Sequence, residues 1–186
     1  IPRGTYGIKK YEANFELIQY DINYGLIRNS GSEESLWNEV PIEGFKLSYN
    51  VTETFALKTP SIKNYQFLGW TGMGFDTPDT VVTIPKGSTG TRKYIANFIG
   101  DEYKLYFDYD GGTPVELPVD YPYEKKVNYD KYVNMSVPRF TKIIDGVTYY
   151  SYKWQIDGKD VTDGFLWKYT ENKTAKLIYI SQSIQL

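Results

Sequence analysis

One stretch of the chain carries carboxylates at the spacing of an oxygen-ligand metal loop. Asp108 and Asp110 alternate and are followed by the turn pair Gly111-Gly112. Calcium loops use this arrangement because alternate carboxylates can surround one hard cation while a glycine makes the sharp turn. The next residues add at most one more carboxylate, Glu116, so the usual ligand set is incomplete. The sequence therefore favours a strand end closed by a Gly-Gly turn, and no metal site or cofactor is predicted.

A second glycine-rich stretch, Lys86–Gly90, has the residue types of a phosphate-binding loop. Such loops hold phosphate because backbone N–H groups and the N-terminus of a following helix point at the anion. Here the glycines lead into Tyr94, Ala96 and Phe98, whose alternation is typical of a strand. The helix terminus that would bind the phosphate is therefore not predicted.

The tryptophans are candidates for ligand contact, because an indole face can stack on a sugar. Trp70 and Trp154 occupy equivalent places in two similar parts of the chain, and repetition at a fixed place favours a core role. Trp37 and Trp167 have no counterpart in the other part. They are therefore the better candidates for exposed, ligand-binding residues.

Tyr121 and Tyr123 begin an aromatic-rich stretch in which lysines are interleaved. The stretch could form a ligand or glycan surface, or a stacking platform for a single nucleic-acid strand. Its acidic residues, among them Glu124 and Asp130, cancel the lysine charge, so nucleic acid is disfavoured. The plainer interpretation is a pairing strand with one solvated face.

The composition removes several classes of enzyme. There is no cysteine and no histidine, which excludes disulfides, thiolate metal sites, cysteine nucleophiles and imidazole general bases. Carboxylate, lysine and tyrosine chemistry remains. The 23 acidic residues leave a carboxylate-dependent glycoside hydrolase open. No carboxylate pair stands in a repeated or glycine-framed context, so we expect a protein that is not an enzyme.

Charge and hydropathy limit the partners. The net charge is −2 and the isoelectric point about 5.3, so the chain has no positive field to attract nucleic acid or an anionic membrane. No apolar run approaches the roughly 18–20 residues that span a bilayer. The aromatic content of 17%, mostly tyrosine, favours half-buried strands.

A long repeat organises the chain. IPRGTYGIKKYEANF (residues 1–15) recurs as IPKGSTGTRKYIANF (residues 84–98), with nine of fifteen positions identical. Each copy predicts a glycine turn followed by a strand with three apolar side chains on one face. We expect residues 1–15 to be the closing strand of a preceding repeat, within a fragment of a longer polypeptide. Without the rest of its module that segment must pair with residues 16–99, pack on another chain, or stay mobile.

Further strands are predicted from alternating apolar residues. The segments in the first part are Glu16–Leu26, Phe45–Leu57, Tyr65–Trp70 and Thr80–Ile84, and those in the second are Lys104–Tyr109, Thr148–Ile156, Phe165–Tyr169 and Ala175–Ile180. Within Phe45–Leu57 the alternation breaks near Glu53 and resumes at Phe55. Asp157-Gly158 predicts a hairpin turn. Ser32–Val40 could form about two helical turns, with Ser32 as the cap.

The motifs Tyr65–Trp70, Val82–Gly90 and Tyr94-x-Ala96-x-Phe98 resemble the Listeria–Bacteroides repeat, a family that includes the B-repeat of internalin-type surface proteins. The residues that carry the resemblance are Gly69, Trp70, Pro85, Gly87, Gly90, Tyr94, Ala96 and Phe98, with Trp154 in the second part. The second part matches only in outline, because Lys153 stands where the Gly of Gly-Trp is expected and the Ile-Pro-Lys-Gly turn is absent.

The resemblance implies a mainly β fold, with α+β also possible, built from tandem β-grasp-like modules with little helix. The expected divisions are 1–15, 16–99 and a diverged terminal repeat at 100–186. The resemblance also implies an extracellular place on the bacterial surface or cell wall, contact with neighbouring repeats, no catalytic residues, and a role in spacing and adhesion. The alternative is a glycan- or host-protein-binding module centred on the second part.

Overall fold

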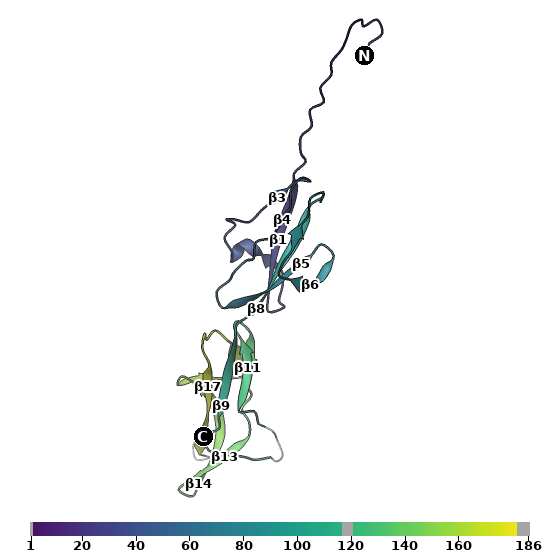
Figure 1. The fold of residues 1–186 in the computed structure, drawn as a ribbon. Coiled ribbons are helices and arrows are strands. Elements are labelled where there is room, and N and C mark those ends of the chain that lie inside the picture. The colour runs from purple at the N-terminus through teal and green to yellow at the C-terminus, as the bar shows by residue number, and fades with distance from the viewer. Residues whose placement is uncertain (1, 117–120, 182–186) are drawn as a thin grey trace.

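The computed structural model describes residues 2–116 and 121–181, and it is mainly β, as the composition and alternation predict. Two sheet assemblies lie end to end, and the N-terminal segment extends away from the far end of the first (Figure 1). Within the described ranges the one helical element is a three-residue 3₁₀ turn, η1 (Leu36–Asn38). No helix in the same ranges is long and apolar enough to cross a membrane.

The first sheet is built around a parallel pair of long strands. Its members are β1 (Tyr20–Arg28), β2 (Glu34–Ser35), β3 (Ser48–Tyr49), β5 (Tyr65–Gly72), β6 (Phe75–Asp79) and β8 (Arg92–Gly100). The order is β2-β1-β8-β5-β6, with β3 also paired to β1. β1 and β8 run parallel, while β5 pairs antiparallel on the other side of β8. A separate ribbon joins β4 (Phe55–Ala56) to β7 (Thr83–Ile84).

The second sheet repeats this central arrangement. Its members are β9 (Glu102–Asp108), β10 (Thr113–Pro114), β11 (Glu124–Asn128), β13 (Phe140–Ile144), β14 (Val147–Ile156), β15 (Lys159–Val161) and β17 (Lys173–Ser181). The order is β10-β13-β14-β17-β9-β11, with β15 paired to β14. β9 and β17 run parallel and β14 pairs antiparallel with β17. β12 (Tyr132–Asn134) and β16 (Gly164–Leu166) form a ribbon.

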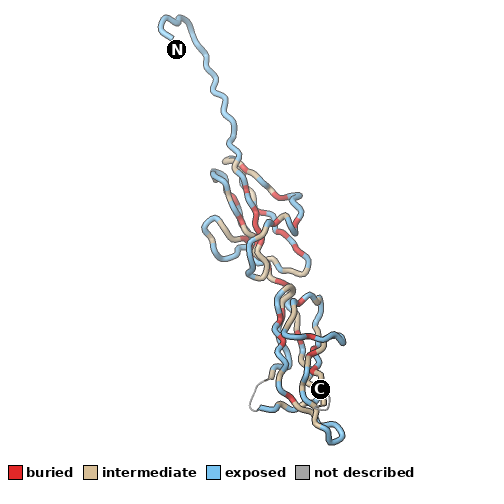
Figure 2. Tube along the Cα trace, turned by 180° about the vertical axis from the view of Figure 1, so that it is seen from behind, coloured by how far each residue is buried: buried red, intermediate tan, exposed pale blue. Residues whose placement is uncertain are grey.

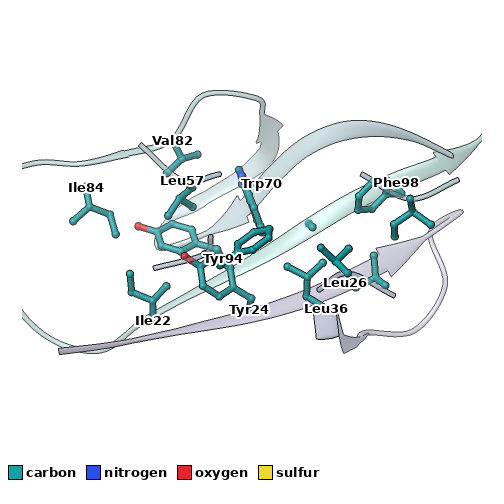
Figure 3. Packing of buried hydrophobic residues seen from close by; sticks show 14 of the residues in the cluster. Ile22, Tyr24, Leu26, Leu36, Leu57, Trp70, Val82, Ile84, Tyr94 and Phe98 are labelled. Carbon is teal, nitrogen blue, oxygen red and sulfur yellow. The ribbon is translucent and has the colours of Figure 1, made fainter. Parts of the chain in front are cut away.

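Each assembly has its own hydrophobic core (Figure 2). In the first, Trp70 lies at the centre beside Tyr24 and Tyr94 (Figure 3), with the Tyr24 and Trp70 ring centres 5.5 Å apart. In the second, Trp154 and Trp167 are both fully buried. Two separate cores are compatible with divisions at 16–99 and 100–186. Those divisions and the β-grasp-like assignment stay predictions. A β-grasp fold ordinarily includes an α-helix on its sheet, whereas the described residues contain only η1.

The repeated motif is a buried strand in one copy and not in the other. In β8, Tyr94, Ala96 and Phe98 are all buried, as their alternation predicts. The same motif near the N-terminus is fully exposed: Phe15 is 91% exposed, and residues 2–19 contain no strand. The predicted strand over Glu16–Leu26 accordingly begins only at Tyr20. β8 is flanked by β1 and β5, whereas no strand among the described residues pairs with residues 2–15.

Of two other local predictions, one was wrong and one was confirmed. The helix expected at Ser32–Val40 is reduced to η1, because β2 takes Glu34 and Ser35 into the sheet. The break in alternation expected near Glu53 within Phe45–Leu57 is confirmed: a turn in which Glu53 N–H donates to the Asn50 carbonyl at 3.2 Å separates β3 from β4.

Candidate functional site

The junction between the two assemblies is made by almost no linker. β8 ends at Gly100 and β9 begins at Glu102, so Asp101 alone lies between them. The backbone of Asp101 is bound on both sides: its N–H donates to the Asn64 carbonyl at 2.9 Å, and its carbonyl accepts from the N–H of Tyr129 at 2.9 Å. The connecting residue is therefore fixed by backbone groups of both assemblies.

Asn29 hydrogen-bonds across this junction. It follows β1 and adopts φ +50°, a left-handed conformation that asparagine tolerates better than most residues. Its Nδ2 donates to the carbonyl oxygens of Tyr129 at 3.0 Å and Asp130 at 3.3 Å, and its Oδ1 accepts from Gly100 N–H at 2.8 Å. One side chain thus binds the end of β8 and the loop after β11 together.

A second contact is built on Tyr65 at the start of β5. Its hydroxyl donates to the Asp130 carboxylate at 2.7 Å, and its ring packs edge-to-face on Tyr129 at 5.6 Å. Lys168 also pairs with Asp130. Burial raises the pKa of Asp130, but the hydrogen bonds from Lys168 and Tyr65 outweigh it, so the pKa lies below the ordinary value. Burial and the bond to Asp130 raise the pKa of Tyr65.

Gly100 is required by the closeness of this contact. A Cβ at this position would lie 2.1 Å from the carbonyl oxygen of Tyr129, which is a backbone atom that cannot rotate away. Any side chain here would force the two assemblies apart. The junction is therefore a packed interface as well as a covalent connection.

An aromatic pocket opens at the other end of the second assembly, away from the junction. The cavity has a volume of about 560 Å³ and is lined by the end of β9, the turn after it, the residues leading into β11 and the start of β13. Tyr109 stacks on Phe140 with ring centres 4.7 Å apart and planes 7° apart. Tyr121 packs edge-to-face on Phe140 at 4.6 Å, and Tyr123 on Tyr109 at 6.0 Å.

Two aspartates at this pocket differ in their partners. Asp110 is paired with Lys142 at 2.9 Å and Lys176 at 3.2 Å, and the hydrogen bond from Lys142 lowers its pKa. Asp108 uses one carboxylate oxygen to accept the Asp110 N–H at 2.8 Å. Its other oxygen has no hydrogen-bond partner in the described part of the chain. The rim of the pocket thus carries one carboxylate oxygen that is free to accept a hydrogen bond.

The structure separates the four residues predicted to bind ligands. Tyr121 and Tyr123 both line the aromatic pocket, and Tyr123 is 78% exposed. Trp167 is 0% exposed, so the expectation that it forms an exposed contact was wrong. It packs among rings of the second core, including Tyr103 and Tyr169. Trp37 is only half-buried, but it packs on Tyr24 and Phe45 as part of the first core instead of standing free.

The glycine-rich stretches take structural roles. Gly87 and Gly90 adopt φ +87° and +82° in the turn after β7, and Ser88 N–H donates to the Pro85 carbonyl at 3.2 Å. Gly69 adopts φ +135° at a β-bulge, where a Cβ would lie 2.7 Å from the backbone of Asp79. Within residues 2–116 and 121–181 no group of three or more acidic side chains is placed to hold a metal ion.

Comparison with protein-family models, curated proteins and solved structures finds no match. The resemblance to the Listeria–Bacteroides repeat therefore stays a prediction made from the motif residues. What the chain does has to be argued from the junction and the pocket.

No sequence pattern indicated the junction residues. Asn29 stands in a polar loop, and Tyr65 and Asp130 looked like ordinary strand and turn residues. The signal that could have drawn attention to them is the one-residue gap between two strand patterns. So short a connection requires the flanking loops to touch.

Proposed function

We propose that this chain is a non-enzymatic segment of a bacterial surface protein that acts as a stiff stalk. The observation that carries the proposal is the junction, where Asp101 is the whole linker and Asn29 and Tyr65 hydrogen-bond across it. Flexibly linked modules reorient freely, whereas a packed, hydrogen-bonded joint transmits direction from one module to the next. A stalk needs that property to hold a distal domain at a distance.

The repeat supports the same role. The motif of residues 84–98 closes one module and recurs at residues 1–15. In repeat proteins each unit contacts its neighbours and the array extends in one direction. The elongated, end-to-end arrangement of the two assemblies suits such an array (Figure 1).

The charges at the pocket argue against hydrolysis there. A glycosidase needs one carboxyl group that is protonated near neutral pH to act as the general acid. Asp110 is held ionised by Lys142 and Lys176, and its pKa is lowered rather than raised. We therefore propose that Asp110 does not serve as such a general acid.

Residual dipolar couplings on the full chain test the stalk. If the joint is stiff, the alignment tensors fitted separately to the two assemblies have the same magnitude and orientation. Two tensors of clearly different magnitude would show independent tumbling and would refute the proposal. Asp145→Asn, in the exposed hairpin turn between β13 and β14, is a control variant that should leave the alignment tensors unchanged. It lies away from the junction, and an asparagine tolerates its φ of +50°.

A further inference from the structure

We propose that the aromatic pocket at the end of β9 binds a neutral pyranose sugar. This site is independent of the stalk role, because it lies away from the junction. Its size is appropriate, since a cavity of about 560 Å³ falls within the range of small-molecule sites.

The walls suit the apolar face of a sugar ring. Tyr121 and Tyr123 present aromatic groups at the opening, while the stack of Tyr109 on Phe140 fixes the base. Phe140 is 4% exposed and Tyr109 donates its hydroxyl to the Pro122 carbonyl at 2.8 Å, so this base is already rigid. A preformed aromatic wall costs little ordering entropy when a ligand stacks on it.

The polar groups at the rim suit hydroxyls. The free oxygen of Asp108 accepts hydrogen bonds, and the hydroxyls of Tyr121 and Tyr123, which have no hydrogen-bond partner among the described residues, can donate or accept. A purely apolar ligand would displace water from these groups without replacing the hydrogen bonds that the water makes. A sugar offers both an apolar C–H face and a ring of hydroxyls.

The local charges select a neutral ligand. Asp108 and Asp110 line the pocket and disfavour an anion, while Lys142 and Lys176 pair with Asp110 from outside the lining and offset the negative charge. These four charges sum to zero, so neither sign of ligand gains from the field. A second hollow of about 210 Å³ shares Phe107, Tyr109 and Tyr121 with the first, which leaves room beside the pocket for a second sugar unit.

Titration of the full chain, followed by amide chemical shifts, tests the proposal. The probes are methyl β-glucopyranoside, methyl β-galactopyranoside, N-acetylglucosamine and their β1,4-linked disaccharides, with choline and inorganic phosphate as charged comparisons. We expect saturable binding of at least one neutral sugar, with a Kd on the order of 1 mM. The largest shifts should fall at residues 107–112, 121–123 and 140.

Variants locate the binding. Tyr123→Ala should weaken the sugar's affinity about tenfold without unfolding the protein, because the side chain is 78% exposed. Asp108→Asn should weaken it less, since an amide still accepts through its oxygen. Tyr152→Ala, which changes an exposed tyrosine on β14 of the same assembly, should leave the Kd unchanged.

Three results would overturn the proposal. They are the absence of saturation with every neutral sugar, tighter binding of choline or phosphate than of any sugar, and an unchanged Kd in Tyr123→Ala. Because these readouts are independent of the alignment tensors of the two assemblies, failure here leaves the stalk proposal standing, and the reverse also holds.

Discussion

The side-chain amide of Asn29 donates a 3.0 Å hydrogen bond to the backbone carbonyl of Tyr129, 100 residues further along the chain. The same side chain accepts the N–H of Gly100 at 2.8 Å. Asn29 therefore hydrogen-bonds to both sides of the junction: its Oδ1 accepts from the end of the first assembly, and its Nδ2 donates to the second. Changing the donor alone separates these two tasks.

Asn29→Asp should loosen the junction while leaving each assembly folded. Aspartate keeps the acceptor for Gly100 and tolerates the left-handed backbone, but it places a carboxylate against the Tyr129 and Asp130 carbonyls. Loss of the donated bonds and the new repulsion should cost the contact about 1–3 kcal/mol. The alignment tensors of the two assemblies should diverge, and identical tensors would contradict the assigned role of Asn29.

Gly100→Ala should force the assemblies apart by steric contact alone. The added methyl group would lie 2.1 Å from the Tyr129 carbonyl oxygen. Asp145→Asn, in the exposed turn between β13 and β14, is the control, because it lies away from the junction and asparagine tolerates its φ of +50°. Small-angle scattering should show a broader distribution of overall dimensions for Gly100→Ala than for the control. Equal scattering curves would mean that the backbone can relax around the new methyl group.

Acid should weaken the junction through Asp130. Its folded pKa is lowered below the ordinary 3.8, so its contribution is fully present above that value and is lost as pH falls through the folded pKa. The pair is partly exposed, which limits the contribution to about 1 kcal/mol. The alignment tensors should therefore diverge below about pH 4. In Asp130→Asn the divergence should already be present at neutral pH and should lose its acid dependence.

The same substitution should strongly destabilise one copy of the repeated motif and hardly affect the other. Phe98→Ala removes a side chain that is 2% exposed and should destabilise the first assembly by about 3–5 kcal/mol. Phe15→Ala changes a side chain that is 91% exposed and should stay within about 0.5 kcal/mol of the parent. Denaturant unfolding measures both. A large loss in Phe15→Ala would show that residues 2–15 pack on a partner.

Alkali should weaken the junction through Tyr65, whereas acid acts through Asp130. Burial and the bond to Asp130 raise the folded pKa of Tyr65, so its contribution is fully present below its unfolded value of about 10 and falls as pH rises beyond it. Tyr65→Phe should remove this alkaline loss from the pH profile of the junction. If the junction of Tyr65→Phe still weakens at high pH as in the parent, the loss belongs to another tyrosine.

Strand positions and their buried faces could be predicted to a useful extent. Alternation located β5, β8, β14 and β17 and identified Tyr94, Ala96 and Phe98 as one buried face. It also placed Tyr121 and Tyr123 in a candidate binding stretch, and both line the aromatic pocket. These predictions succeed because side-chain alternation is a local property of an extended backbone.

Exposure of single aromatic residues could not be predicted in this way. Trp167 lacks a counterpart in the other copy, yet it is fully buried among rings contributed by Tyr103, Phe165 and Tyr169. Phe165 and Tyr169 flank Trp167 in the sequence, but Tyr103 comes from β9, a distant point of the chain. Repetition indicates which positions the fold shares, but a residue used in one copy only can still belong to that copy's core.

The sequence alone determined the repeat and the face of each strand that carries its apolar residues. Only the tertiary structure decided whether such a face is buried. The motif of Tyr94 and Phe98 lies between β1 and β5, while the motif of Tyr11 and Phe15 pairs with no strand in the described part of the chain and stays exposed. The same holds for the junction, which depends on Asn29 and Tyr65 reaching residues 100 and 65 positions away. The physical reason is that a strand's hydrogen bonds and burial are supplied by other segments, so no local pattern contains them.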